Sequence, residues 1–346
     1  MIICYLYKGY IFKYNIYDLL LRSLFFMKYD FDAAFVRKYI EDFCNGYDYP
    51  AEATETFLSV FDKVCADKEL NDRFFAPVRD YAAGKKFRYG DHLAGSKAKN
   101  GGECKLVAEK LGVSTYTTDF LYCLCLIPYL EKLYEEKGLD KKIFSDGMID
   151  FKCKLWECKK VYNVWGSFVA GWFGGWFTLG RFQFGRLQYE PMKHIWIVTK
   201  LGENKEKRVK LWQKFLNMHI PSMGPLRPEE VEESFKQAYD FFRKRGYGKD
   251  IVYHTSSWLL SPDHRKMFKP DSNIVRFMDC FKVVSVYDEK DNGDFWRIYD
   301  RPYDSKKPDC SGATTMQKGY AEIILAGGHI KHGSGVFIYD GEKFYK

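Results

Sequence analysis

The hydrophobic residues of this chain change their spacing once, and that change divides the sequence into two halves of different secondary structure. From about residue 31 to 175, apolar residues recur every three or four positions, as in "AEATETFLSVFDKVCA", which is typical of amphipathic helices. From "LGRFQFGRLQYEP" onward, apolar and polar residues alternate between turn-forming residues, which is typical of strands. The sequence therefore predicts an α+β protein, with an all-helical first half and a mixed second half containing antiparallel hairpins.

The boundary between the halves falls in an apolar, glycine-rich stretch, "GSFVAGWFGGWFTLG". A chain of 346 residues exceeds the size at which a single core keeps growing, so two domains are expected. Because no Pro-rich or Ser-rich linker separates them, we expect a helical domain over 27–175 packed closely against a second domain over 176–346. Within the second domain we expect a helix over 228–244 and a long strand over 273–288.

The first 26 residues are apolar, but four charged side chains interrupt them, so no uncharged run is long enough to span a membrane. The basic start and small-residue cleavage site of a signal peptide are also missing. We expect either that Met27 is the natural start or that residues 1–26 are a poorly ordered extension. The alternative is one more amphipathic helix packed on the body of the protein.

Composition and cysteine spacing narrow the class of protein. The net charge of +8 comes from cations scattered among acidic residues, as in "ENKEKRVK", without a basic stripe or a nucleic-acid-binding motif. We therefore expect no nucleic-acid partner and no membrane partner. The ten cysteines include no Cys-x-x-Cys pair, which indicates free thiols and a cytoplasmic location.

The stretch "LNMHIPSMGPLRPEEVEE" has the residues of an anion-binding loop between a strand and a helix. A strand expected over 214–220 ends at a proline, which cannot donate to a sheet ladder. Ser222, Met223 and Gly224 can then turn their N–H groups outward, and glycine adopts unusual dihedral angles without steric cost. The helix that begins at Pro228 presents its positive end to an anion. The alternative is an ordinary turn, with two glutamates in the first helical turn satisfying the helix dipole.

Several side chains at the ends of expected strands have the chemistry of an active site. His219 is a candidate general base because imidazole titrates near neutral pH, and a structural histidine is the alternative. Glu190 closes the "RLQYE" strand and is the best carboxylate candidate for deprotonating an amine, with a plain exposed acid as the alternative. In "YHTSSWLLSP", Ser257 can bond a ligand and Trp258 can wall a pocket, although core burial is the commoner fate of a tryptophan.

The sequence lacks the motifs of several other enzyme classes. It contains no G-x-S-x-G elbow, which disfavours an esterase-like hydrolase, and no P-loop or Rossmann pattern. His329 and His332 have a metal-compatible spacing, but no acidic partner is nearby in the sequence. We therefore expect no metal site.

Four stretches of the second half resemble, in order, uncharacterised bacterial proteins described as acyltransferase-domain proteins: "LGRFQFGRLQYE", "HIPSMGPLRPEEVEESFKQAYDFF", "HTSSWLLSPDHRKMF" and "DSNIVRF". Those proteins pair an α-helical N-terminal domain with a GNAT-like C-terminal domain, and the resemblance covers roughly residues 28–346. It implies an N-acyltransferase that takes acetyl-CoA or another acyl-CoA as donor, uses no metal, and acylates a small-molecule or peptide amine.

The resemblance also implies roles for individual residues. The implied pyrophosphate loop spans 222–227 and supplies Ser222, Met223, Gly224, Leu226 and Arg227 to the cofactor. Substrate contacts are assigned to Arg186, Ser257 and Trp258.

In the implied mechanism, the amine attacks the thioester directly while Glu190 or His219 accepts its proton, and Tyr253 is the candidate acid for the departing thiolate. The loop departs from the R/Q-x-x-G-x-G/A pattern of such transferases, because it has one glycine and Pro225 lacks an N–H. The alternative is a non-catalytic GNAT-like module that binds a peptide, nucleotide or acyl ligand.

Overall fold

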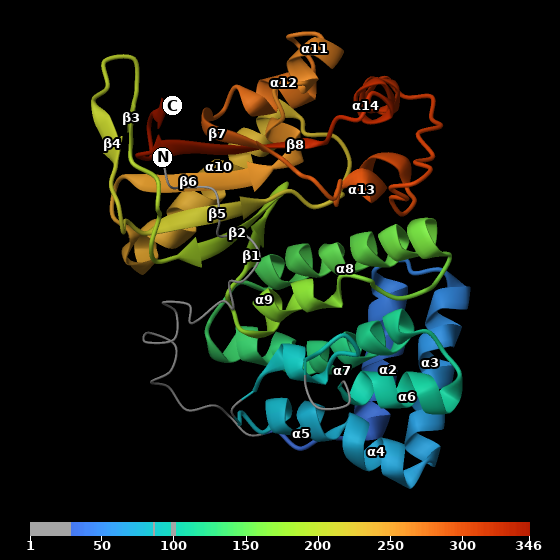
Figure 1. The fold of residues 1–346 in the computed structure, drawn as a ribbon. Coiled ribbons are helices and arrows are strands. Elements are labelled where there is room, and N and C mark those ends of the chain that lie inside the picture. Colours follow the sequence, from blue (N-terminus) through green and yellow to red (C-terminus); the bar gives the residue numbers. More distant parts are fainter. Residues whose placement is uncertain (1–28, 86, 98–101) are drawn as a thin grey trace.

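The computed structural model of the chain describes residues 29–85, 87–97 and 102–346, so the expectations for residues 1–26 lie outside the described residues. A helical part occupies one end of the molecule and a sheet part the other (Figure 1). The predicted α+β organisation is confirmed.

The helical part is built from consecutive helices that pack around one long, buried helix. The helices are α2 (Ala33–Gly46), α3 (Ala51–Ala66), α4 (Lys68–Phe74), α5 (Ala76–Ala82), α6 (Glu103–Leu111), α7 (Thr115–Glu136), α8 (Lys141–Tyr162) and α9 (Gly174–Phe177). The central helix is α7, whose residues from Thr117 to Leu130 are all buried. A helix that is apolar all around its circumference, as in "FLYCLCLIPYL", is stable only when other elements surround it.

The second part contains a seven-stranded sheet and a separate two-stranded hairpin. Its strands are β1 (Phe182–Phe184), β2 (Leu187–Met192), β3 (Thr199–Leu201), β4 (Lys207–Val209), β5 (Phe215–His219), β6 (Ile251–Ser257), β7 (Lys282–Asp288), β8 (Lys331–Tyr339) and β9 (Phe344–Tyr345). Its helices are α10 (Pro228–Phe242), α11 (His264–Met267), α12 (Asn273–Met278), α13 (Phe295–Tyr299) and α14 (Thr315–Leu325). The order in the main sheet is β1-β2-β5-β6-β8-β7, and β9 pairs with β8.

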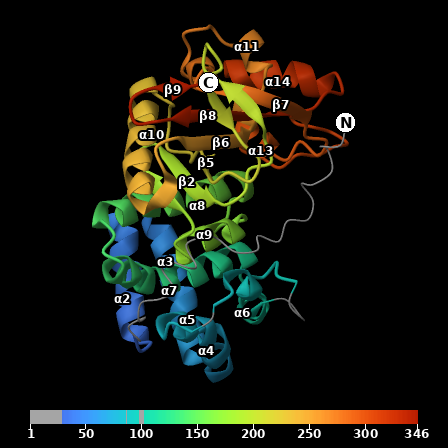
Figure 2. The same ribbon diagram turned by 90° about the vertical axis from the view of Figure 1, so that its left-hand side faces the viewer.

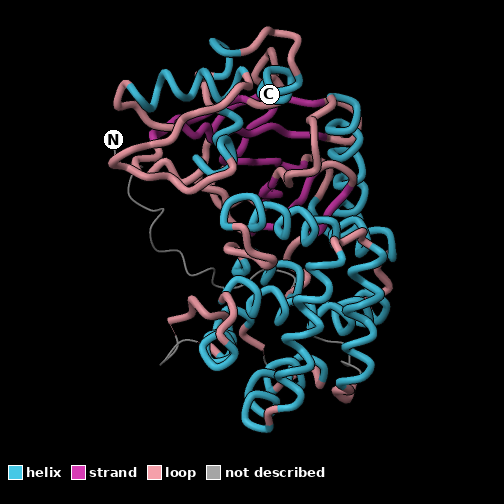
Figure 3. Tube along the Cα trace, turned by 90° about the vertical axis from the view of Figure 1, so that its right-hand side faces the viewer, coloured by secondary structure: helices cyan, strands magenta, loops and turns pink. Residues whose placement is uncertain are grey.

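The two central strands of the sheet, β5 and β6, are parallel, whereas the other pairs of this sheet are antiparallel. Their pairing ends at Asn217 and His254, although β5 continues to His219 and β6 continues to Ser257. The sheet therefore opens between these strands at one end. Figure 3 shows the strands gathered between flanking helices, and helices with their connecting loops in the lower part of the molecule.

The opposite faces of the sheet are covered by different elements. Tyr253 and Phe337 stack at 4.6 Å between ring centroids and lie beneath Phe235 of α10. On the other face, Val252 and Ile338 pack in a small cluster with apolar residues of the hairpin β3–β4. Figure 2 shows α10 along one side of the sheet and α13 and α14 on the other side.

The expected strand over 273–288 is wrong in its first half. Asn273–Met278 forms helix α12, because the Ser272 side chain caps its start by accepting a hydrogen bond from the N–H of Val275. Only Lys282–Asp288 forms a strand. A serine cap at the start of a short apolar run therefore decided the local structure, against the strand propensity of the residues that follow.

Helix α8 joins the two parts. It lies lengthwise beneath the sheet (Figure 1), and one continuous hydrophobic core extends from α2 to β8. Among the helices of the described residues, none combines the length and the apolar character needed to cross a membrane.

Candidate active site

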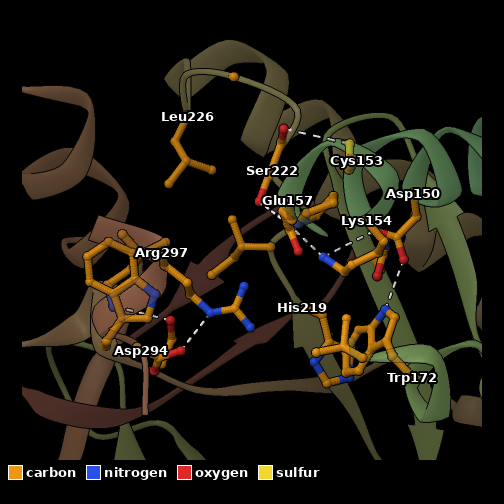
Figure 4. Close-up of a pocket in the computed structure, with 18 of the residues that line it drawn as sticks. Asp150, Cys153, Lys154, Glu157, Trp172, His219, Ser222, Leu226, Asp294 and Arg297 are labelled. Atoms are coloured by element: carbon orange, nitrogen blue, oxygen red, sulfur yellow. Dashed lines mark hydrogen bonds and ion pairs between the residues drawn. The ribbon is translucent and has the colours of Figure 1, made fainter. Parts of the chain in front are cut away.

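A cavity of about 800 Å³ lies between α8 and the open end of the sheet (Figure 4). Its wall is formed by one face of α8, the loop that follows β5, the ends of β5 and β6, and α13. The split between β5 and β6 therefore opens directly into the space between the two parts of the molecule. Because the pairing of β5 and β6 stops before the strands end, the ends of both strands line the cavity together with the loop and α8.

The loop after β5 agrees in part with the predicted anion cradle, because the N–H of Met223, expected to turn outward, donates instead to the Pro221 carbonyl at 2.8 Å. Gly224 has φ +97°, which side-chain-bearing residues rarely adopt, and a Cβ added there would contact nothing within 4 Å. The space in front of Gly224 is therefore open. The helix behind the loop, α10, begins at Pro228 as the sequence predicts.

Arg186 holds this loop in shape from the inside. Its guanidinium donates to the carbonyl oxygens of Pro221 (2.9 Å), Gly224 (2.7 Å) and Pro225 (3.1 Å). Burial lowers the pKa of Arg186, although a guanidinium stays charged in proteins. Because these carbonyl groups turn toward Arg186, the guanidinium adds positive charge behind the loop. Arg186 also lines the cavity, so its predicted contact with substrate stays a prediction, although three of its donors are engaged by the loop.

The other loop residues divide into two groups. Ser222, Gly224 and Leu226 line the cavity, as expected. Met223 and Arg227 do not line it. The sulfur of Met223 lies against the Gln183 amide at 2.9 Å, and Arg227 forms an exposed ion pair with Glu230 at 2.7 Å. These two side chains were predicted to bind the cofactor, and the structure turns both away from the cavity.

A buried charged cluster on α8 faces the loop. Lys154 lies 2.9 Å from Glu157 and 3.7 Å from Asp150, and all three side chains are at least nine-tenths buried. Glu157 accepts a hydrogen bond from the Ser222 hydroxyl at 2.6 Å, and Asp150 accepts one from the Trp172 indole at 2.9 Å. Figure 4 shows these contacts side by side at the cavity wall. The cluster ties the helical part to the loop.

Sequence reasoning missed this cluster, although a signal was present. Asp150, Lys154 and Glu157 follow one another at four and three positions, which places them on one face of a helix. Opposite charges on one face are usually solvated, so nothing in the sequence alone indicates that this face meets a loop 65 residues further along the chain.

His219 and Glu190 lie side by side at the end of the sheet. His219 Nε2 is 2.9 Å from a Glu190 carboxylate oxygen, and Arg181 contacts the other oxygen. Burial would raise the pKa of Glu190, but the charges and hydrogen bonds of Arg181 and His219 outweigh it and hold that pKa well below its usual range. Glu190 is therefore a poor proton acceptor, which contradicts its predicted role as a base.

The His219 ring lines the cavity and packs edge-on against Trp172, with 4.7 Å between ring centroids. When Nε2–H donates to Glu190, the lone pair is on Nδ1. Within the described residues no group hydrogen-bonds to Nδ1. Glu190 thus orients the imidazole and fixes its tautomer, and His219 is the group in this pair with the chemistry of a base.

Tyr253 does not lie in the cavity, so its predicted role as general acid is wrong. Its side chain is fully buried beneath α10 and donates a hydrogen bond to the Phe235 carbonyl at 3.0 Å. Burial also raises its pKa well above the ordinary value, which makes the phenol a weaker acid. The next residue, His254, points to the opposite face of the sheet, as the alternation of a strand requires.

We expect the Tyr253→Phe variant to keep the activity of the wild type within about twofold and to lose about 1 kcal/mol of folding stability, because one buried hydrogen bond is removed. Denaturant unfolding and steady-state rates check both values. A large loss of kcat at unchanged folding stability would show that Tyr253 takes part in catalysis.

Ser257 and Trp258 line the cavity at the end of β6, as expected. The Ser257 hydroxyl accepts a hydrogen bond from the N–H of Leu259 at 3.1 Å, so it caps the following turn. The Trp258 ring is half-buried and packs edge-on against His264. Both side chains therefore form part of the wall, on the side opposite α8.

His332 lies beside two acidic residues, so the expectation that it has no acidic partner is wrong. Its Nε2 is 2.6 Å from a Glu289 oxygen and 2.7 Å from an Asp294 oxygen, and this geometry is compatible with a metal ion. Arg297 also binds Asp294, at 2.6 Å, so two carboxylates already face two cationic groups. Asp294, Arg297 and His332 form the rim of the cavity.

The acidic neighbours of His332 give the folded protein a pH dependence. Burial lowers the pKa of His332, but Asp294 and Glu289 outweigh it and raise that pKa to about 9. The folded state therefore holds the proton more tightly than the unfolded state. The stabilisation is complete below about pH 6.5 and is lost as pH rises through about 9, with a magnitude on the order of 3 kcal/mol.

We expect the free energy of unfolding to fall over this pH range in the wild type and to change much less in His332→Gln. Chemical denaturation as a function of pH measures the difference. His194→Gln, which alters an exposed histidine, is the control and should follow the wild type. If the free energy of unfolding depended on pH in the same way in the wild type and in His332→Gln, His332 would not be the source of this pH dependence.

Two known domain families match the sequence. Residues 38–179 match the family described as "N-acyltransferase N-terminal domain", and residues 181–337 match the family described as "GNAT-like C-terminal domain". The chain pairs these two domains. The resemblance noted from the sequence is therefore confirmed.

Solved structures of similar fold are acyltransferases. One, an acyltransferase mutant in complex with octanoyl-CoA, has a TM-score of 0.60 and 16% sequence identity over 86% of this chain and 86% of its own. Another, in complex with decanoyl-CoA, has a TM-score of 0.54 and 17% identity over 90% of this chain and 99% of its own. A third, in complex with decanoyl-CoA and teicoplanin, has a TM-score of 0.52 and 14% identity over 86% and 98%. At these identities the likeness establishes the shared fold. No curated protein matches the chain.

Proposed function

We propose that this protein transfers an acyl group from an acyl-CoA to an amine, and that the transfer takes place in the cavity between the N-acyltransferase N-terminal domain and the GNAT-like domain. One observation carries the proposal: an open anion cradle, a split between parallel strands and an oriented histidine face the same space. The acyltransferases of similar fold were crystallised with CoA esters, which supports an acyl-CoA as the donor.

The donor is held by groups of the GNAT-like domain. The CoA pyrophosphate lies against the N–H groups of Ser222, Gly224 and Leu226, with the positive end of α10 and the Arg186 guanidinium behind them. The pantetheine arm enters the split between β5 and β6, where the two strands no longer pair with each other. Backbone N–H groups at the end of β5 polarise the thioester carbonyl.

In the reaction, the amine nitrogen forms a bond to the thioester carbonyl carbon and the carbon–sulfur bond breaks. His219 accepts the proton of the attacking amine, and CoA leaves as the thiolate. Glu190 touches neither reactant and acts as a positioning residue, because it holds the imidazole through Nε2. Most of the rate enhancement comes from holding donor and acceptor in contact.

The acceptor is a small-molecule or peptide amine that enters on the side of α13. This side of the cavity offers Trp258 as an apolar wall, which suits an amine on an apolar framework. An acyltransferase of similar fold was crystallised with the glycopeptide teicoplanin, and the acceptor class proposed here is consistent with it.

Calorimetric titration with CoA, acetyl-CoA and octanoyl-CoA tests the proposal. We expect wild-type protein to bind at least one ester and Gly224→Trp to lose that binding, because an indole would fill the open space before the loop. Glycine also tolerates φ +97° where tryptophan does not, so unfolding of the variant must be measured alongside. Leu325→Trp, at an exposed position on α14, is the control for bulk. No heat with any ester would favour a GNAT-like binding module without catalytic activity.

A further inference from the structure

The hairpin β3–β4 lies within an arm formed by residues 193–214, which has both buried and exposed apolar side chains. Ile195, Leu201 and Val209 are buried against the sheet. The arm patch consists of the exposed side chains of Trp196, Val198, Leu211 and Trp212. These four are a large share of the exposed large hydrophobic residues of the described chain.

The two tryptophans of the arm patch are unusually exposed. Trp196 is 63% exposed and Trp212 is 51% exposed, and their rings contact each other at 4.1 Å between centroids and 64° between planes. Soluble proteins rarely leave such side chains in contact with water in a group, and a contiguous exposed apolar patch marks a binding surface.

Trp212 is also held in an unfavourable backbone conformation. Its φ is +64°, in the left-handed region that bulky residues avoid, although its N–H bonds to the Ile195 carbonyl at 3.0 Å. A glycine would adopt this conformation without strain. A tryptophan at position 212 therefore does not stabilise the fold, because its side chain is exposed and its backbone is strained. We take this as evidence that Trp212 has a role at the surface.

Positive charge surrounds the arm patch. Residues 193–214 contain seven lysines and arginines against two glutamates, a net charge of +5 in a chain whose total is +8. One of these cations, Lys207, pairs with Asp250, but Lys200, Arg208 and Lys210 are exposed around the patch. Tryptophan next to aliphatic side chains within a basic rim is the composition of surfaces that insert shallowly into anionic bilayers.

From this juxtaposition we propose that the arm is a docking surface for an anionic lipid bilayer. The indoles and the aliphatic side chains of the arm patch enter the headgroup region, and the basic rim binds anionic headgroups. Base stacking of a single-stranded nucleic acid fits less well, because Trp196 and Trp212 pack against each other and Val198 and Leu211 offer no stacking face. The sequence predicts no membrane partner, and this proposal revises that expectation.

The arm is separate from the cavity. It lies at one end of the strands in Figure 1, whereas α13, which lines the cavity, lies at the other end. A change in the arm patch therefore leaves donor binding intact. The proposal does not depend on the acyltransferase reaction, and the two can fail independently.

Co-sedimentation of the full chain with vesicles tests the proposal. We expect binding to vesicles of phosphatidylcholine mixed with phosphatidylglycerol, little binding to phosphatidylcholine alone, and weaker binding as salt is raised. The double variant Trp196→Ser/Trp212→Gly should bind at least about tenfold more weakly, because the inserting side chains are gone. It should still fold, because neither indole is buried and the glycine removes strain.

Two comparisons make the result decisive. Leu325→Ser, at the 67% exposed position on α14, removes an exposed apolar side chain elsewhere and should bind vesicles as the wild type does. Calorimetry with acyl-CoA should give the same result for the double variant and the wild type, which separates the arm from the proposed active site. Equal binding of the double variant and the wild type to anionic vesicles would overturn the proposal. The proposal would also be overturned if the protein did not bind vesicles and the arm instead mediated dimer formation or the binding of single-stranded nucleic acid.

Discussion

The His219→Ala variant is expected to lower kcat/KM by about 10²–10⁴-fold, the usual contribution of a positioned general base. The imidazole lines the cavity and Glu190 holds its Nε2 at 2.9 Å, so the variant removes the oriented base from the cavity wall. Glu190 keeps its ion pair with Arg181 in the variant, and this pair still disfavours protonation of the carboxylate. The release of CoA in the presence of an amine mixture measures the rate.

Donor binding is the internal control for this variant. His219 lies at the end of β5, whereas the cradle that holds the pyrophosphate is the loop after it, so we expect the affinity for CoA to change by less than about threefold. A low rate with normal affinity assigns His219 to the chemical step. A variant that retains the wild-type rate would show that the amine loses its proton elsewhere, directly to water for example.

The Arg186→Met variant is expected to lose about 3–5 kcal/mol of folding stability and to bind CoA at least about tenfold more weakly. Methionine fills a similar space but leaves the carbonyl groups of Pro221, Gly224 and Pro225 without their donor. The loop then loses both its shape and the positive charge behind it. Denaturant unfolding and calorimetry measure the two effects.

A neighbouring arginine provides the matched control. Arg227 is exposed and pairs only with Glu230, so Arg227→Met should change stability by no more than about 0.5 kcal/mol. Arg186→Lys should fall between the wild type and Arg186→Met, because an ammonium group keeps the charge but cannot reach all the carbonyl groups in a fixed fork. Wild-type stability in Arg186→Met would show that the loop does not depend on this side chain.

Local sequence signals predicted most of the fold. The change from helical to strand spacing separated the two halves, and a strand ending at a proline before a glycine located the loop at 222–227. These signals succeed because they depend on neighbouring residues. They also account for the error at 273–278, where a serine cap outweighed strand propensity.

The site itself depends on contacts between distant segments, and the sequence could not supply these. Tyr253 and His254 point to opposite faces of the same strand, and the pattern does not tell which face packs against α10. Arg186 meets a loop more than 30 residues away, and His332 meets Glu289 because the antiparallel strands β7 and β8 pair although two helices separate them in the sequence. Each of these meetings is a result of tertiary packing.

The position of the domain boundary also depends on contacts between distant residues. The boundary proposed from the sequence at 175 and 176 falls inside α9, and the Trp176 ring lies so close to Gly147 of α8 that a Cβ there would contact it at 2.7 Å. Trp176 therefore packs with the helical domain. We now propose a boundary at Gly180, between the two matched regions.

A crystal structure of the protein with octanoyl-CoA tests the proposed acyl transfer most directly. We expect the pyrophosphate against the loop 222–227, the pantetheine between β5 and β6, and the thioester beside His219. An acyl-CoA bound elsewhere, or one whose thioester lies away from His219, would contradict it.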